Sequence, residues 1–212
     1  PKTYLPNYRE FYELRQFTPG DACARRVIDL CGQRDVPFGS ELVFQSAEQA
    51  DLRVHVEICE DLWAPLPPST FGALAGATVL VNLSASNVTV GKDGYRRQLA
   101  ASQSARCLSA YVYCAAGYGE STTDLAWDGH GLIYENGVSL AESERFRYES
   151  QLVCADIDLD RLCQDRMRQN TFAQAVARHR REIAAFRTIE FATRRPVVAS
   201  VPLERGYDRF PF

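Results

Sequence analysis

The chain alternates between two hydrophobic periods, and the switches between them predict successive strands and helices. Residues 54–58, Val-His-Val-Glu-Ile, alternate with the period of a strand, and the run 77–83 is largely apolar, as in a strand buried on both faces. Between them, Ser69 is expected to cap a short helix that ends near Ala75. Helical spacing over 95–109, followed by an apolar run over 111–116, repeats this unit and predicts parallel strands.

The second half of the chain predicts a hairpin, a further strand and two helices. Two short apolar runs flank Asn136-Gly137, a pair favoured in the type I′ turn of a hairpin. The other expected elements are a strand over 151–157, a helix from Leu159, and a longer helix over about 172–191 that Pro196 ends. No repeat or flexible linker separates these elements, so we expect one α/β domain over residues 1–212.

Composition narrows the class of protein. A chain of 212 residues, 46% of them hydrophobic, can bury one sizeable core. A net charge of −3 gives no electrostatic reason to expect nucleic acid or an anionic membrane as a partner, so small substrates fit better. Seven cysteines without a C-x-x-C pair favour a reducing compartment. With no signal peptide or membrane-spanning run, we expect a cytoplasmic protein.

Cys59 is the first candidate for chemistry. It directly follows the strand 54–58, and the carboxyl ends of parallel strands are where α/β folds place reactive groups. The alternative is a small buried hydrophobe, to which we assign the other cysteines unless they lie at the surface. A thiol attacks an amide as the thiolate, which needs a cation or hydrogen-bond donors beside it. Lys2 and Lys92 are the only lysines, although chance explains their retention about as well.

Two other patterns imitate metal sites. Residues 156–160 resemble the start of a calcium loop, but Arg161 and Met167 stand where a glycine and a bidentate glutamate are required. We interpret this segment as a strand end and a helix cap. The three histidines have no acidic or cysteine partner at ligand spacing, so no metal is predicted.

Three ordered segments carry a resemblance that composition does not. They are residues 2–13 (Lys-Thr-Tyr-Leu-Pro-Asn-Tyr-Arg-Glu-Phe-Tyr-Glu), 57–63 (Glu-Ile-Cys-Glu-Asp-Leu-Trp) and 82–86 (Asn-Leu-Ser-Ala-Ser). Together with segments 118–129, 142–146 and 204–212, they resemble the nitrilase (carbon–nitrogen hydrolase) superfamily, specifically the glutaminase domains of bacterial glutamine-dependent NAD synthetases. The resemblance implies a four-layer α/β/β/α sandwich, incomplete at its N-terminus, with residues 1–212 forming most of the glutaminase domain.

The resemblance also implies roles for individual residues. It makes Cys59 the nucleophile that attacks the side-chain amide of glutamine, expels ammonia and leaves a thioester for water to hydrolyse. Lys2 and the backbone N–H of Glu60 would hold the oxyanion. Glu60, Tyr8 and Ser86 would bind the free amino acid, with Glu60 on its ammonium group. A core tyrosine and a loop-stabilising serine are the alternatives for Tyr8 and Ser86.

Parts of the family's machinery are expected outside this chain. The family's general-base glutamate precedes its lysine, and only Pro1 precedes Lys2 here. No glycine-rich pyrophosphate loop is present, so the domain itself should need no cofactor. ATP and magnesium are expected in a synthetase domain of the same polypeptide, which would use the ammonia to amidate nicotinic acid adenine dinucleotide to NAD. The resemblance also implies a homo-oligomer paired across helical faces.

Two alternatives stay open. One is a stand-alone nitrilase-type amidase acting on another small amide, against which the segment Tyr8-Arg9-Glu10-Phe11 argues. The other is a catalytically inert fragment with a structural role, which the missing glutamate favours for the fragment but not for its parent.

Overall fold

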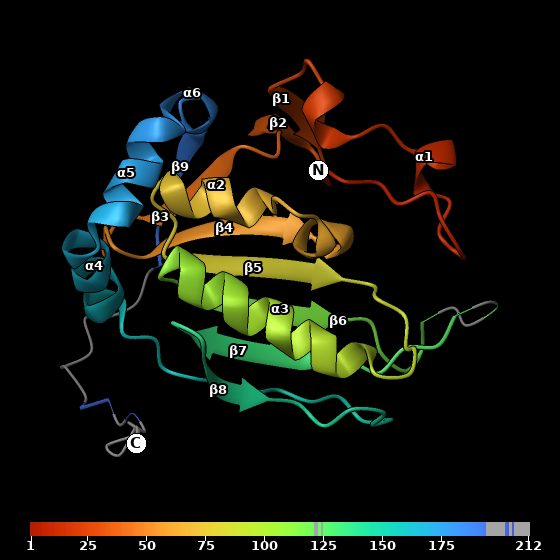
Figure 1. The fold of residues 1–212 in the computed structure, drawn as a ribbon. Coiled ribbons are helices and arrows are strands. Elements are labelled where there is room, and N and C mark those ends of the chain that lie inside the picture. Colours follow the sequence, from red (N-terminus) through yellow and green to blue (C-terminus); the bar gives the residue numbers. More distant parts are fainter. Residues whose placement is uncertain (121–122, 124, 194–201, 204, 206–212) are drawn as a thin grey trace.

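A seven-stranded sheet forms the centre of the molecule. The computed structural model describes residues 1–120, 123, 125–193, 202–203 and 205 (Figure 1). The strand order is β8-β7-β6-β5-β4-β3-β9. Three central strands are parallel to one another, as the sequence predicts: β4 (Arg53–Ile58), β5 (Val79–Ser84) and β6 (Ala110–Ala115). They are flanked by β3 (Leu42–Ser46) and β9 (Arg187–Phe191) on one side, and by the hairpin β7 (Gly131–Glu135) and β8 (Val138–Glu142) on the other.

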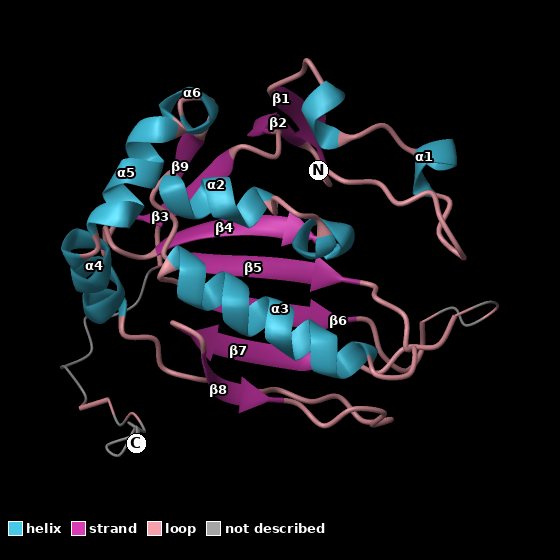
Figure 2. Cartoon of the chain, in the orientation of Figure 1, coloured by secondary structure: helices cyan, strands magenta, loops and turns pink. Residues whose placement is uncertain are grey.

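Helices α2 (Pro68–Leu74) and α3 (Lys92–Cys107) cover one face of this sheet (Figure 1). Since side chains of a strand alternate between its two faces, every second residue of the central strands points toward the helices and is buried. These buried residues are His55, Glu57, Leu80, Asn82, Tyr111 and Tyr113. Figure 2 shows this helical layer in front of the strands. The predicted α/β class is confirmed.

The described residues supply two of the four expected layers. On the sheet face opposite α2 and α3, Val54, Val56 and Val81 are only partly buried, and Leu83 is 53% exposed. No second sheet formed by the described residues therefore covers this apolar face.

The remaining elements lie near the two ends of the central strands (Figure 1). Helices α4 (Leu159–Arg168), α5 (Asn170–Arg178) and α6 (Arg180–Ile183) follow one another near the starts of β4 and β5 (Figure 1). The expected cap of α4 is present, because the Asp158 carboxylate accepts the Arg161 N–H at 2.9 Å. The N-terminal region, near the ends of β4 and β5, holds α1 (Glu13–Gln16), η1 (Gly20–Ala22), β1 (Val27–Leu30) and β2 (Gln33–Pro37). Within the described residues, no helix is long and apolar enough to cross a bilayer.

Three sequence predictions are wrong. No strand forms over 151–157. The long helix over 172–191 is instead α5, α6 and the strand β9, because Arg187–Phe191 pairs with β3 and this tertiary pairing overrides the helical pattern. Ser69 does not cap α2, which begins at Pro68; the Ser69 N–H donates to the Glu57 carboxylate at 2.9 Å. Pro196 lies outside the described residues.

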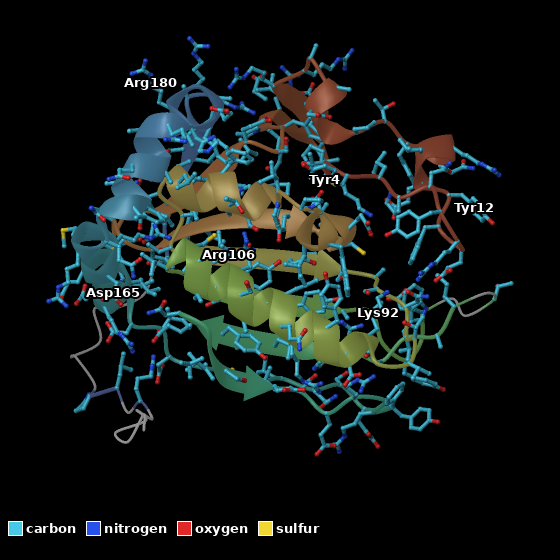
Figure 3. The ribbon with its side chains drawn as sticks, in the orientation of Figure 1. Tyr4, Tyr12, Lys92, Arg106, Asp165 and Arg180 are labelled. Carbon is cyan, nitrogen blue, oxygen red and sulfur yellow. The ribbon has the colours of Figure 1, made fainter. Side chains whose placement is uncertain are left out.

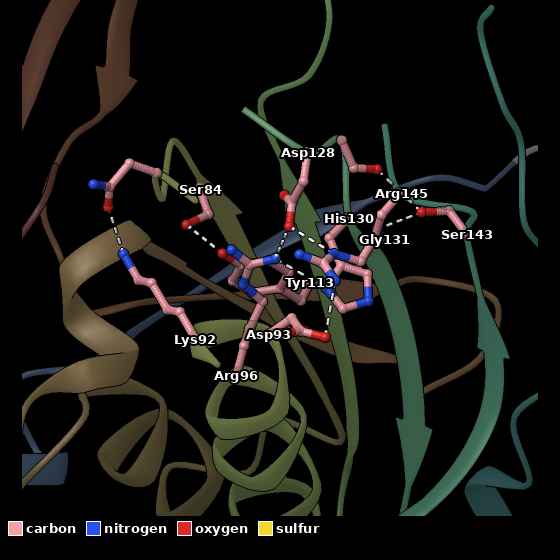
Figure 4. Close-up of polar contacts among 12 residues, drawn as sticks. Ser84, Lys92, Asp93, Arg96, Tyr113, Asp128, His130, Gly131, Ser143 and Arg145 are labelled. Carbon is pink, nitrogen blue, oxygen red and sulfur yellow. Dashed lines mark hydrogen bonds and ion pairs between the residues drawn. The ribbon is translucent and has the colours of Figure 1, made fainter. Parts of the chain in front are cut away.

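A buried charge network ties α3 to the sheet (Figure 4). Arg96 Nη1 donates to Asp128 Oδ2 at 2.8 Å and to His130 Nδ1 at 2.9 Å, and Arg145 Nε reaches the same carboxylate oxygen at 3.0 Å. Burial acts to raise the pKa of Asp128, but the two guanidinium groups hold it below its ordinary value. Burial lowers the pKa of His130, whose Nε2–H donates to Glu142 at 2.8 Å. This network holds α3, which begins at the candidate site.

Candidate active site

Cys59 stands in a tight turn at the end of β4, where the sequence places it. It opens the short 3₁₀ helix η2 (Cys59–Trp63) with a φ of +49°, a left-handed conformation that is rare for residues with a side chain. The side chain of Asn82 on β5 binds both backbone groups of Cys59. Its Oδ1 accepts the Cys59 N–H at 3.2 Å, and its Nδ2 donates to the Cys59 carbonyl at 3.3 Å. The neighbouring strand therefore holds the nucleophile candidate in its unusual backbone conformation.

Glu57, on β4 two residues before Cys59, binds the same Asn82 side chain and the start of α2. Its carboxylate accepts the Ser69 N–H at 2.9 Å, the Asn82 Nδ2 at 3.4 Å and the Tyr111 hydroxyl. Burial raises the pKa of Glu57 above its ordinary value, while these donors act in the opposite direction. The sequence analysis assigns Glu57 and Asn82 no role of their own, although each begins a segment that carries the resemblance.

A first cavity, the lysine cavity, brings Cys59 and Lys2 together. It has a volume of about 870 Å³, and its lining also includes Glu13, Leu83, Cys114 and Trp127. Lys2 Nζ donates to Glu13 Oε2 at 2.6 Å, and the Lys2 side chain is 10% exposed. The two predicted catalytic residues thus share one cavity although they lie far apart in sequence. Glu13 carries no signal that sequence reasoning used; its contact with Lys2 makes it a candidate.

A second cavity, the polar cavity, joins Cys59 to the three predicted substrate-binding residues. Its volume is about 350 Å³, and Tyr8, Glu60 and Ser86 all line it. The Tyr8 hydroxyl donates to Glu60 Oε1 at 2.6 Å, and burial, with this bond to Glu60, raises the pKa of Tyr8. Ser86 is 2% exposed, and its Oγ has no hydrogen-bond partner within bonding distance among the described residues. The nearby Tyr113 hydroxyl donates to Ser84 at 2.8 Å.

Lys92 also lines the polar cavity, although sequence analysis assigned it no role. As the first residue of α3 it lies at the end of the helix opposite Arg106 (Figure 3). Its Nζ donates to Asn87 Oδ1 at 2.6 Å (Figure 4). The same atom lies 5.0 Å from the centre of the Trp63 ring. Burial lowers the pKa of Lys92, and the positive charge of Arg96 adds to this effect. The signal available in the sequence was the scarcity of lysine.

The arrangement suits a small zwitterion with a reactive group at one end. The polar cavity offers a carboxylate at Glu60 and an ammonium at Lys92, which match the two charges of a free amino acid. Cys59 lines both cavities, and the lysine cavity places the ammonium group of Lys2 on the other side of it. Within the described residues, no group of three or more His, Cys, Asp or Glu side chains could hold a metal ion.

The amino-acid sequence of this chain is similar to that of characterised enzymes. No protein-family model matches the chain. The chain is 53% identical over all of its 212 residues to the glutamine-dependent NAD(+) synthetase of Mycobacterium leprae, and 52% identical to that of Mycobacterium tuberculosis. It spans 31% of the length of each of these relatives. Of the segments that carry the resemblance, residues 121–122, 124, 204 and 206–212 lie outside those that the structure describes.

Solved structures agree with this relationship. A glutamine-dependent NAD(+) synthetase from Cytophaga hutchinsonii is 29% identical, with a TM-score of 0.56 over 68% of this chain and 22% of that protein. A carbon–nitrogen hydrolase from Helicobacter pylori gives a TM-score of 0.62 over 87% of this chain and 60% of that one; at 16% identity it shows the shared fold alone. The chain is therefore homologous over its whole length to the glutamine-dependent NAD(+) synthetases of mycobacteria, and it corresponds to about one third of the length of these relatives.

Proposed function

We propose that this chain is the part of a glutamine-dependent NAD synthetase that hydrolyses glutamine to glutamate and ammonia, with Cys59 as the nucleophile. The observation that carries the proposal is the position of Cys59 between two cavities of different character. One cavity presents groups that suit a free amino acid, and the other presents the cation that an amide-attacking thiol requires.

Glutamine would bind in the polar cavity through its two charged groups. The Glu60 carboxylate would accept the α-ammonium group, and the Lys92 ammonium would pair with the α-carboxylate. The unpaired Oγ of Ser86 and the hydroxyl of Tyr8 would complete the hydrogen bonds of these groups. With both ends of the amino acid backbone held, the side-chain amide would be directed toward Cys59.

The chemistry follows from the groups around Cys59. Its Sγ, as the thiolate, forms a bond to the amide carbon while the carbonyl electron pair moves onto oxygen. Lys2 and the Glu60 N–H would hold this oxyanion, and the loss of one such donor typically costs roughly 100- to 1000-fold in rate. The C–N bond then breaks and the nitrogen takes a proton and leaves as ammonia. Water attacks the thioester, the C–S bond breaks, and glutamate leaves as the thiol is restored.

Proton transfer in both steps belongs to the general-base glutamate that the family resemblance places before Lys2, outside residues 1–212. Ammonia would pass to a synthetase domain of the same polypeptide and amidate nicotinic acid adenine dinucleotide. This last step rests on the names of the relatives and on the 31% share of their length that the chain spans.

The test is site-specific labelling of the protein as encoded, with any sequence that flanks residues 1–212. The probe is a glutamine-like diazoketone, and peptide mapping by mass spectrometry locates the adduct. Cys114 is the matched internal control, because it lines the lysine cavity with Cys59 but is exposed, whereas Cys59 is buried. Accessibility alone would therefore direct the label to Cys114.

We expect one adduct, on Cys59, that L-glutamine suppresses and that Cys59→Ala abolishes together with glutamine hydrolysis. Labelling of Cys114 instead, or no labelling, would remove Cys59 from the role of nucleophile. Adduct formation on Cys59 that L-glutamine does not suppress, with hydrolysis of other short amides, would favour the stand-alone amidase.

A further inference from the structure

Asp61 connects the two segments that carry Lys2 and Cys59. Its Oδ1 accepts the backbone N–H groups of Thr3 at 3.1 Å and Tyr4 at 2.8 Å, and its Oδ2 accepts the N–H of Ile58 at 3.0 Å. Thr3 directly follows Lys2, and Ile58 directly precedes Cys59. One carboxylate thus fixes the backbone beside each of the two candidate catalytic residues.

The contacts of Asp61 with Thr3 and Tyr4 do not contribute to the turn in which Asp61 itself lies. The bond from the Ile58 N–H closes the first turn of η2, which is a common use of an aspartate. Thr3 and Tyr4, by contrast, belong to the N-terminal segment, which no described strand pairing attaches to the seven-stranded sheet. The bonds of Asp61 Oδ1 to the Thr3 and Tyr4 N–H groups are therefore not needed to form the η2 turn.

Among the hydrogen bonds that join the N-terminal segment to residues 60–66, those of Asp61 are the buried ones. Its side chain is 1% exposed. The other described hydrogen bonds from the N-terminal segment to residues 60–66 join Tyr8 to Glu60 and Tyr4 to the Leu66 carbonyl, and both lie at the exposed surface. Burial raises the pKa of Asp61, against the effect of the N–H groups that favour the carboxylate. Water competes less for the bonds of Asp61 than for these two exposed bonds, so among the contacts with residues 60–66 those of Asp61 hold the segment most firmly.

We propose that Asp61 is a positioning residue that sets the Lys2 ammonium relative to the Cys59 thiol. This inference rests on the proposed roles of these two residues. Asp61 is not among the residues that line the two cavities, and its contacts are with the backbone of Thr3, Tyr4 and Ile58. A displacement of about 1 Å in a catalytic group can lower a rate by roughly 100-fold.

Asp61→Asn tests this with little change in volume. An amide keeps one acceptor oxygen, but its NH₂ must then face backbone N–H groups on one side. We expect alkylation of Cys59 by iodoacetamide at neutral pH, in the protein as encoded, to slow by about tenfold or more. Its pH profile should shift toward higher pH, because a thiolate that loses its neighbouring cation forms less readily.

A double-mutant cycle separates positioning from general damage. If Asp61 acts through Lys2, Asp61→Asn should slow alkylation strongly when Lys2 is present and hardly at all in a Lys2→Ala background. Asp128→Asn is the matched control, since it neutralises another buried carboxylate that has no contact with Lys2. Its effect should be equal in both backgrounds.

Additive effects of Asp61→Asn and Lys2→Ala would overturn this inference while leaving the proposed function intact. If Lys2→Ala alone changes neither alkylation nor glutamine hydrolysis, the role of Lys2 fails and this inference fails with it, while the proposed function stands. Absence of glutamine hydrolysis in the unsubstituted protein would instead overturn the proposed function. Should Asp61→Asn not fold, as judged by circular dichroism, Asp61→Ser replaces it in the same cycle, because a hydroxyl keeps one acceptor and admits water. The same coupling with Lys2 is then required.

Discussion

The ammonium group of Lys2 lies 2.6 Å from Oε2 of Glu13, within the cavity that both residues share with Cys59. A charged hydrogen bond of this length fixes the position of a side chain that otherwise has many rotamers. Glu13 thereby restrains the cation that we assign to the oxyanion.

Glu13→Gln should slow glutamine hydrolysis without weakening glutamine binding. A neutral amide binds the ammonium less tightly, and hydrogen bonds to charged groups contribute about 1.5–3 kcal/mol, which corresponds to roughly 10- to 100-fold in rate. We expect kcat to fall in this range while KM changes little, measured by glutamate release. Glu120→Gln is the control, because Glu120 lines the same cavity and makes no described contact with Lys2. Equal losses in both variants would contradict the role of Glu13.

Lys92→Met should weaken glutamine binding and spare the chemical step. Loss of the ammonium removes the proposed partner of the α-carboxylate, so we expect KM for glutamine to rise by about tenfold or more with kcat nearly unchanged. A glutamine analogue with an amidated α-carboxyl group should show no such difference between the two proteins. Arg97→Met is the control, since Arg97 is paired with Asp93 and Glu142 and is not among the residues lining the polar cavity. A fall in kcat alone would assign Lys92 elsewhere.

Asp128→Asn should destabilise the fold more than an exposed charge change does. Arg96 and Asp128 are both buried, and removal of one partner leaves an uncompensated charge that typically costs about 3–5 kcal/mol. Glu144→Gln, which breaks an exposed pair with Arg147 outside this network, should lower the free energy of unfolding far less. Urea unfolding monitored by circular dichroism measures both. Equal free energies of unfolding for the two variants would refute the importance of the buried network.

His55 should make stability fall on acidification. Its side chain is 1% exposed, its Nδ1–H donates to the Leu42 carbonyl at 2.9 Å, and burial lowers its pKa in the folded state. The unfolded state, with a histidine pKa near ~6.5, therefore binds more protons, and stability is lost as the pH falls below about 6.5 toward the lower folded value. We expect His55→Gln to flatten this decline in urea unfolding between about pH 7 and 5. His179→Gln, at an exposed histidine, is the control, and an equal effect of the two substitutions would contradict the role of His55.

The sequence by itself determined the central strands and the place of Cys59 among them. The alternation over 54–58 and the apolar runs before and after 95–109 depend on local periodicity, which the structure reproduces in β4, β5 and β6. The same periodicity predicts the α/β class, and the resemblance supplies five site residues, each of which lines at least one of the two cavities. Their roles await the experiments described above.

Only the tertiary structure decided which distant residues meet. Residues 187–191 became the strand β9 because β3 offers an open edge, a fact that no local window contains. The N-terminal segment passes the ends of the strands, and there Lys2 pairs with Glu13 and the backbone of Thr3 and Tyr4 meets Asp61. The same segment lines the polar cavity together with Lys92 at the start of α3. Periodicity reports which face of an element is buried, whereas these contacts depend on packing between elements.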